Sequence, residues 1–190
     1  MRYLAIFLAG FFLFLACDRE YSPAPRGFFR IDYPEKQYET WSGDCPFTYE
    51  YPEYAGVYPD TTGETEPCWQ NIYFPDFDAY IHLSYKPVTE FQGINELRED
   101  ARTFAYEHTV RASDIDKSSR KLDEQSMGTI YEIDGEAASA VQFYVTDTNH
   151  HYMRGALYFD APMQRDSLNP LIDFLQEDVE HFMETLEWEY

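Results

Sequence analysis

Alternating apolar and polar side chains predict most of the strands in this sequence. In residues 46–59, the aromatic side chains of Phe47, Tyr49 and Tyr51 fall on one face of an extended chain, because alternate residues of a strand point to the same side. Further runs with this alternation predict strands at about residues 70–74, 79–85, 128–133, 138–146 and 151–159.

Turn residues indicate how these strands connect. The Asp-Gly pair at 134–135 is a tight-turn signal, and the polar residues 147–149 form another, so we expect the last three strands to form an antiparallel meander. A short edge strand is also expected around Ile31 and Tyr33, which alternate with polar residues until Pro34 interrupts the pattern.

Two other stretches repeat apolar residues every three or four positions, which is the spacing of one helix face. The first predicts a helix at about residues 93–110, with the apolar stripe Ile94, Leu97, Ala101, Phe104 and His108. The second begins at Asn169-Pro170, an N-cap followed by proline at the first helical position. Its stripe runs to the end of the chain through Leu171, Leu175, Val179, Phe182 and Leu186. Residues 113–126 are polar without a period, and we expect them to form a mobile surface connection.

Strands flanked by two amphipathic helices predict an α+β fold, in which both helices pack on an antiparallel sheet. The length suits one domain, which we assign to residues 27–190.

The first sixteen residues, MRYLAIFLAGFFLFLA, have the pattern of an export signal: Arg2 precedes an apolar run that ends next to Cys17. This run is shorter than the roughly 20 residues that a membrane-spanning helix needs. A small residue before a cysteine fits cleavage by a lipoprotein signal peptidase. We therefore expect residues 1–16 to be removed, Cys17 to carry lipid that anchors the protein to a membrane, and residues 17–26 to form a short tether. The alternatives are an ordinary secretory signal that is cut elsewhere and a retained anchor.

The charge balance excludes one class of partner. The chain has 35 acidic and 14 basic residues, a formal net charge of −21. Nucleic-acid binding depends on basic groups that neutralise phosphates, so we exclude it. Anionic lipid head groups are disfavoured for the same reason, which leaves a solvated surface or a basic protein partner. Aromatic residues make up 18% of the chain, which favours a folded domain over a disordered acidic tail.

The remaining cysteines, Cys45 and Cys68, form a pair once Cys17 is acylated. In an oxidising compartment, we expect a disulfide between them, with a stabilisation of about 3 kcal/mol in the chain-entropy model. Two free thiols are the alternative.

The sequence lacks the motifs of common catalytic sites. No GxSxG, P-loop, HExxH or GxGxxG pattern occurs, so we expect no catalytic residues and no cofactor. His150 and His151 lie near Asp147, but adjacent residues of a strand point to opposite faces, so an exposed pair at a hairpin is favoured over a metal site. The acidic loops 60–66 and 114–124 lack the ligand spacing of a calcium loop, and we expect no metal.

One basic and aromatic patch stands out in this acidic chain, formed by Arg26, Phe28, Phe29 and Arg30. Arg and aromatic residues are enriched at binding hot spots, so the patch is a candidate strip for docking a partner. The alternative is that both phenylalanines belong to the core.

Several segments resemble one family in the same order along the chain. These are PRGFFRIDYPEKQY from Pro25, CPFTYEYPEYA from Cys45, CWQNIYFPDFDAYIHLSYKPV from Cys68 and INELREDARTFAYEHTVRASDI from Ile94. They resemble the GldD-type gliding motility lipoproteins of the Bacteroidetes, in which Cys17 corresponds to the lipid site. The resemblance implies a component of the envelope apparatus for gliding and type IX secretion, with no established enzymatic activity. The order of elements is also similar to the Mog1/PsbP-like α/β/α sandwich.

These observations lead us to expect a lipid-anchored, noncatalytic, periplasm-facing envelope protein that contacts other proteins of the gliding and secretion apparatus. The alternative is an exported ligand-binding or hydrolytic lipoprotein, in which an aromatic cleft holds a sugar or a peptide.

Overall fold

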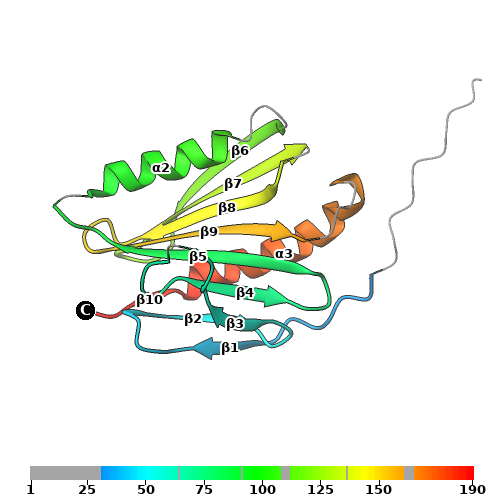
Figure 1. Cartoon of the computed structure of the whole chain (residues 1–190), viewed down its shortest axis with the longest axis horizontal. Helices are drawn as coiled ribbons and strands as arrows, with labels where there is room; N and C mark the ends of the chain where they lie inside the picture. The colour runs from blue at the N-terminus through cyan, green and yellow to red at the C-terminus, as the bar shows by residue number, and fades with distance from the viewer. Residues whose placement is uncertain (1–30, 64, 91, 108–111, 136, 161–164) are drawn as a thin grey trace, which may run out of the picture.

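The structure, a computed structural model, shows a layered arrangement of two helices and two antiparallel sheets (Figure 1). It describes residues 31–63, 65–90, 92–107, 112–135, 137–160 and 165–190. The expected signal peptide 1–16 and the tether 17–26 lie outside these residues. Within them, no helix has the length and apolar character that a membrane crossing requires. The predicted α+β class is confirmed.

The larger sheet has seven strands in the order β3-β4-β5-β9-β8-β7-β6, and every neighbouring pair is antiparallel. The predicted meander is its β7-β8-β9 part. In sheet order, the strands are β3 (Gly56–Pro59), β4 (Gln70–Phe74), β5 (Ala79–Pro87), β9 (His151–Phe159), β8 (Ser139–Thr146), β7 (Met127–Gly135) and β6 (Ala112–Lys121).

The smaller sheet has three strands in the order β1-β2-β10, which are β1 (Tyr38–Trp41), β2 (Phe47–Pro52) and β10 (Glu187–Trp188). Phe47 and Tyr49 of β2 point into the main core, as their shared face predicts, and both are fully buried. This sheet therefore closes one side of the core.

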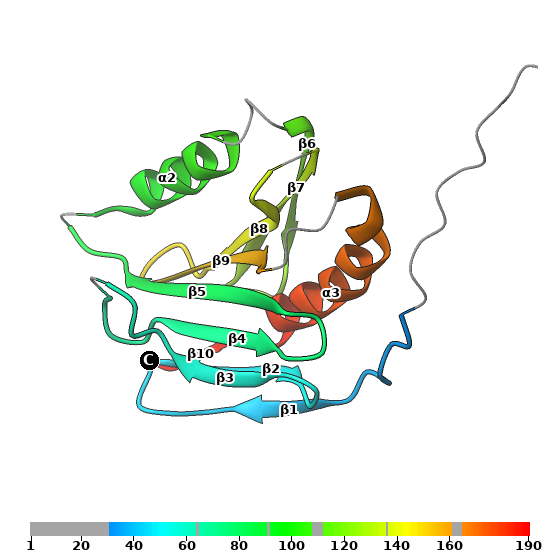
Figure 2. The same cartoon turned by 45° about the vertical axis from the view of Figure 1, so that its right-hand side comes forward.

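The two helices, α2 (Ile94–Glu107) and α3 (Arg165–Thr185), cover opposite faces of the large sheet, as the two views show (Figures 1 and 2). Leu171, Leu175 and Val179 of α3 belong to the main core with β2, β5, β8 and β9. Leu97 and Ala101 of α2 belong to a smaller cluster on the other face. The expectation that both helices pack on an antiparallel sheet is thus confirmed.

Strand β8 is buried along its whole length because it lies between the two helices. Val141 and Phe143 face the core under α3, whereas Tyr144 faces α2. The neighbouring Gly155 makes room for the Phe143 ring, since a Cβ at Gly155 would lie 2.2 Å from a ring carbon.

Two sequence predictions are wrong about where strands lie. Residues 113–126 are not a connection, because most of them form the edge strand β6. No strand forms around Ile31 and Tyr33; the first described strand begins at Tyr38, and the Tyr33 ring instead stacks on Phe174 of α3. In the aromatic stretch 46–59, β2 contains Phe47, Tyr49 and Tyr51, and after a turn that follows Pro52 the second strand, β3, pairs with β4.

Three details of the helices also differ from the prediction. Phe104 of α2 is 46% exposed, and Ala105 takes the buried position instead. Helix α3 starts at Arg165, so Pro170 lies inside it and Asn169 is not its N-cap. The helix ends at Thr185, and the chain continues into β10 rather than remaining helical.

Candidate functional site

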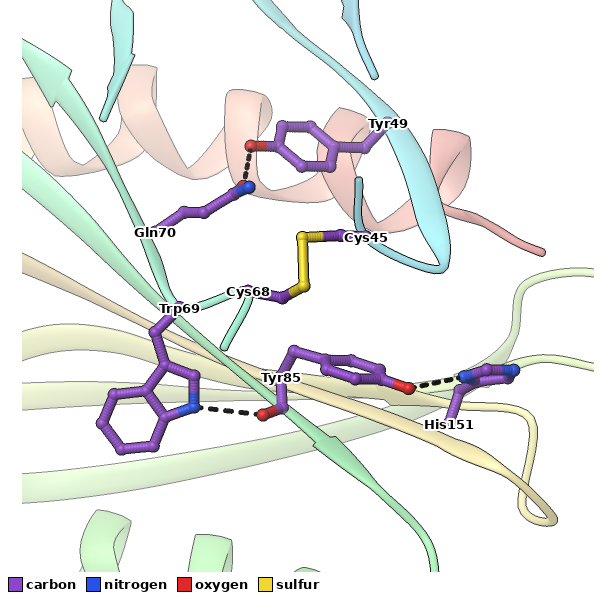
Figure 3. Close-up of a disulfide and its surroundings, with 7 residues drawn as sticks. All are labelled: Cys45, Tyr49, Cys68, Trp69, Gln70, Tyr85 and His151. Carbon is purple, nitrogen blue, oxygen red and sulfur yellow. Dashed lines mark hydrogen bonds between the residues drawn. A yellow bond between two sulfur atoms is a disulfide. The ribbon is translucent and has the colours of Figure 1, made fainter. Parts of the chain in front are cut away.

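A disulfide between Cys45 and Cys68 joins the segment before β2 to the segment before β4, with Cα atoms 5.7 Å apart (Figure 3). This is the pair that the sequence predicts. Cys68 has a φ of 68°, a backbone conformation that costs energy in residues other than glycine. The disulfide therefore fixes the backbone at Cys68, directly before Trp69.

Trp69 is held in a defined position on the other side of this segment. Its indole Nε1 donates a hydrogen bond of 3.0 Å to the backbone oxygen of Tyr85 on β5, and its ring points away from the disulfide (Figure 3). The Trp69 ring forms part of the wall of a cleft.

The cleft lies between α2 and strands β5 and β9 and has a volume of about 290 Å³. Its apolar walls include Trp69, Leu97, Phe104 and Tyr152, and its polar groups are Ser84, Lys86, Asp100 and Arg154.

The strand register explains how these side chains meet. Ser84 pairs with Arg154 and Lys86 pairs with Tyr152 across β5 and β9, so all four point to the face that α2 covers only in part. Helix α2 is tied to this face by the Tyr152 hydroxyl, which donates to the Leu97 backbone oxygen at 3.1 Å. Arg98 Nε adds a second tie, to the Tyr144 hydroxyl at 3.2 Å.

Arg154 is the central cation of the cleft. Its guanidinium donates to Gln142 Oε1 at 2.7 Å, and the ring of Phe104 lies 4.6 Å from it in a cation–π arrangement. Burial lowers the pKa of Arg154, although the neighbouring Tyr158 and Tyr152 oppose this effect. Lys86 supplies a second positive charge and pairs with the partly exposed Glu66 at 3.2 Å.

A second hollow, of about 450 Å³, lies at the turn between β8 and β9 and is lined in part by Asp147, His150 and Tyr190. Asp147 Oδ1 accepts backbone N–H groups of residues 149, 150 and 151 at 3.0, 2.9 and 2.8 Å. Burial raises the pKa of the Asp147 carboxyl, but these donors outweigh it and the pKa lies below its usual value. This carboxylate is committed to shaping the turn.

The predicted exposed pair of histidines is half wrong. The His150 side chain is exposed, but His151 is buried: its Nδ1 lies 2.9 Å from the Tyr85 hydroxyl, and its ring stacks on Trp188 (Figure 3). Among the described residues, no three acidic, histidine or cysteine side chains come close enough to hold a metal ion.

A third polar cluster surrounds Asp178 of α3, whose side chain is 1% exposed. Asp178 accepts Lys36 Nζ at 2.8 Å, the Tyr38 hydroxyl at 2.9 Å and the Tyr54 hydroxyl at 2.6 Å. Lys36 also donates to the Phe174 backbone oxygen at 2.6 Å. Because every member has a partner, the cluster fastens the segment before β1 to α3.

Several predicted site residues lie outside the described part of the chain: Cys17, Arg26, Phe28, Phe29 and Arg30. His108, which was predicted on the apolar face of the first helix, lies outside it as well. The sequence suggested an aromatic cleft only as part of the alternative function, and it named neither the position nor the residues of this cleft. One signal for it is readable in the sequence, because Arg154 is the only charged residue in the run MRGALYF. Its neighbours Lys86 and Phe104 come from other elements and carry no such signal.

Comparisons with known proteins complete the description. A family model described as "Gliding motility lipoprotein GldD" matches residues 18–188. No curated protein matches the chain. A similar solved structure is the solution structure of cyanobacterial PsbP (CyanoP) from Synechocystis sp. PCC 6803, with a TM-score of 0.51 and 6% identity over 84% of this chain and 97% of that one. At this identity, the likeness concerns the fold alone, and it agrees with the PsbP-like sandwich that the sequence suggested.

Proposed function

The chain belongs to the family of GldD gliding motility lipoproteins, and from this premise we propose that it is a noncatalytic component that supports gliding and type IX secretion through contacts with other envelope proteins. The observation that carries the proposal is the extent of the family match. It begins at the residue after Cys17 and covers the described domain up to Trp188. A lipoprotein family implies a membrane-anchored protein of the cell envelope; the periplasm-facing orientation is part of the proposal.

The link between the anchor and the domain supports a role close to the membrane. Residues 18–30 separate Cys17 from the first described residue, and even a fully extended chain of this length spans at most about 45 Å. The segment that follows is fastened to α3 through Lys36 and Asp178. A lipid on Cys17 therefore keeps the domain within reach of other proteins at the same membrane.

The charge of the chain favours proteins over lipid head groups as partners. A net charge of −21 repels an anionic bilayer surface and attracts basic protein surfaces. The protein would thus stand away from the bilayer on its tether and offer its surface to neighbouring envelope proteins.

A replacement of Cys17 tests the anchoring role in the source bacterium. The chromosomal copy is exchanged for a Cys17→Ala version, with Ser22→Ala in the tether as the matched control. We expect Cys17→Ala cells to lose gliding and to secrete less type IX cargo, with the control like the wild type. Normal gliding and secretion by Cys17→Ala cells, at equal protein levels, would contradict the proposal.

Mass spectrometry of the native protein tests the anchor itself. The expected mature chain begins at Cys17 and carries acyl chains. A different start site or an unacylated terminus would remove the anchor from the proposal.

A further inference from the structure

Arg154 has no carboxylate partner among the described residues, since none of the ion pairs that they form includes it. Its neighbours are instead the neutral Gln142 and the ring of Phe104. A partly buried cation without a counter-charge is costly, and proteins rarely keep one without a use for it.

Two hydrogen-bond donors next to this charge also lack acceptors. Arg154 Nε and Gln142 Nε2 are buried, and neither has a partner among the described residues. A buried donor without an acceptor costs about 1–3 kcal/mol. The two side chains are hydrogen-bonded to each other and Arg154 lines the cleft, so an anionic group bound in the cleft would bring acceptors next to them.

The remaining walls suit an apolar body. Trp69 comes from the segment before β4 and Phe104 from α2, and Tyr152 and Leu97 extend the apolar lining. The volume of about 290 Å³ lies near the lower end of the range for small-molecule sites. A ligand of this size would have one charged group and one ring or branched side chain.

We propose that this cleft binds the carboxylate of an aromatic or branched apolar ligand. Arg154 and Lys86 bind the carboxylate, while the apolar body packs between Trp69 and Phe104. Two sources share this chemistry: the C-terminal residue of a peptide and a small free acid. The site is independent of the proposed role in gliding, since binding is measured on the purified protein and gliding in cells.

The local charges favour a carboxylate over a phosphate. Asp100 also lines the cleft and Glu66 already pairs with Lys86, so a doubly charged phosphate would meet two negative side chains beside the two positive ones. A monoanion leaves a better balance, and the planar guanidinium matches a carboxylate. In a protein of net charge −21, Arg154 is a cation without an ion-pair partner among the described residues, and it is the group that selects such a monoanion.

Calorimetric titration of the detergent-solubilised full chain tests the proposal at about 150 mM salt. The probes are N-acetyl-L-phenylalanine and its neutral amide, N-acetyl-L-phenylalaninamide, which differ only in the charged group. We expect the acid to bind at least tenfold more tightly than the amide. Equal affinity of the two probes, or no binding of the acid at 10 mM, would overturn the proposal.

Variants of the cleft locate the binding. Arg154→Gln should remove the preference for the acid, and Arg154→Lys should keep part of it. Phe104→Ala should weaken the binding of the acid at least threefold, and since Phe104 is 46% exposed and outside the core, this variant should fold even if an Arg154 variant does not. The matched control is Arg102→Gln, a cation on the exposed side of α2 that pairs with Glu99. Unchanged binding in both the Arg154→Gln and Phe104→Ala variants would refute the site.

A further pair of probes separates the two sources of the carboxylate. A hexapeptide that ends in Phe with a free C-terminus is compared with 3-phenylpropionate. Tighter binding of the peptide would assign the site to peptide C-termini, and equal or tighter binding of 3-phenylpropionate would assign it to small acids. Both results support the carboxylate site, provided that the amidated hexapeptide binds at least tenfold more weakly than the free one.

Discussion

Two charged side chains of this protein show how differently burial is compensated at the scale of single residues. Asp178 is buried with Lys36 and two tyrosine hydroxyls around it, so its charge is matched within the fold. Arg154 is partly buried with only the neutral Gln142 and the Phe104 ring as direct partners. A fully satisfied cluster makes a structure more rigid, whereas an unmatched buried charge is costly, and this cost is the basis of the ligand proposed for Arg154.

Replacement of Asp178 by alanine should destabilise the protein by about 2–4 kcal/mol, because Lys36 and the hydroxyls of Tyr38 and Tyr54 lose their shared acceptor. Urea unfolding, followed by circular dichroism, measures this change. The control Asp173→Ala lies on the exposed side of the same helix and should change stability by less than about 0.5 kcal/mol. A loss of similar size in both variants would show that the cluster has no special role.

Acidification should weaken the fold in a window set by His151. Burial is the largest influence and lowers the pKa of His151, Asp147 opposes it, and the pKa lies below its ordinary value of 6.5. At pH values between this lowered pKa and about 7, His151 binds a proton in the unfolded chain but not in the folded chain. The free energy of unfolding therefore falls as the pH drops from about 7. The depressed pKa of Asp147 acts separately, and its stabilisation is lost only below about pH 4.

The measurement is urea stability between pH 7.5 and 5, in which His151→Gln should show a smaller fall than the wild type. A glutamine can still accept a hydrogen bond from the Tyr85 hydroxyl. Burial also lowers the pKa of His82, which accounts for part of the pH dependence that remains in the variant. Identical slopes in the wild type and the variant would refute the assignment.

At the scale of elements, strands could be predicted where apolar and polar residues alternate. Strand β6 was missed because its sequence lacks this alternation. Strands β4, β5, β8 and β9 bury one or both faces, so their apolar residues follow the pleat. Strand β6 exposes both faces apart from partly buried positions such as Ile115, and its hydrogen bonds to β7 are invisible in a local pattern. A strand held mainly by backbone pairing leaves little periodic signal.

The helix faces show a second limit of local patterns. The apolar stripe of α2 was read correctly at Leu97 and Ala101, but Phe104 lies beside Arg154 at the cleft instead of in the core. Its place is decided by a residue fifty positions later in the sequence. The disulfide could be predicted because counting cysteines needs no geometry, whereas the cleft depends on contacts between α2, β5 and β9.

Loss of the disulfide should loosen the link between β2 and β4. The double variant Cys45→Ala/Cys68→Ala removes a bridge that spans 23 residues, with an expected loss of about 3 kcal/mol. Urea midpoints with and without a reducing agent measure it: the wild type should weaken on reduction, and the variant should not respond. Rapid thiol labelling of both cysteines in the unreduced native protein would rule out the bridge.

Strand β9 should be intolerant of any side chain at Gly155. Gly155→Ala places a Cβ against the buried ring of Phe143, and we expect a loss of about 1–3 kcal/mol. Adding Phe143→Leu should recover part of this loss, because the smaller leucine side chain leaves room for the added Cβ. The control Gly93→Ser adds a Cβ in open space at the start of α2, where serine is a favourable cap, and should be neutral or stabilising.

At the scale of the whole molecule, fold and family carry different information. The likeness to the cyanobacterial PsbP structure at 6% identity reflects two helices on opposite faces of an antiparallel sheet, an arrangement that many sequences satisfy. The family match covers residues 18–188 and therefore also the acidic surface and the cleft. The proposed function rests on the family, and the proposed ligand rests on Arg154.

The net charge of −21 should make the stability of the domain depend on salt. Salt has two opposite effects on stability, and the direction of the change shows which one dominates. Salt weakens exposed ion pairs such as that of Arg120 with Glu184, but each such pair contributes only about 0–1 kcal/mol. Repulsion among the excess acidic groups acts over distances that are screened when the Debye length shrinks from about 30 Å at 0.01 M salt to about 8 Å at 0.15 M. The relief of repulsion should therefore dominate, and the melting temperature should rise with salt, by about 2–4 °C for each kcal/mol of stability gained.

Scanning calorimetry in NaCl and in CaCl2 at equal ionic strength provides the measurement. Equal shifts would assign the effect to screening, a larger shift with CaCl2 would reveal a specific calcium site in the acidic loops, and a fall in both salts would show that the surface ion pairs outweigh the repulsion.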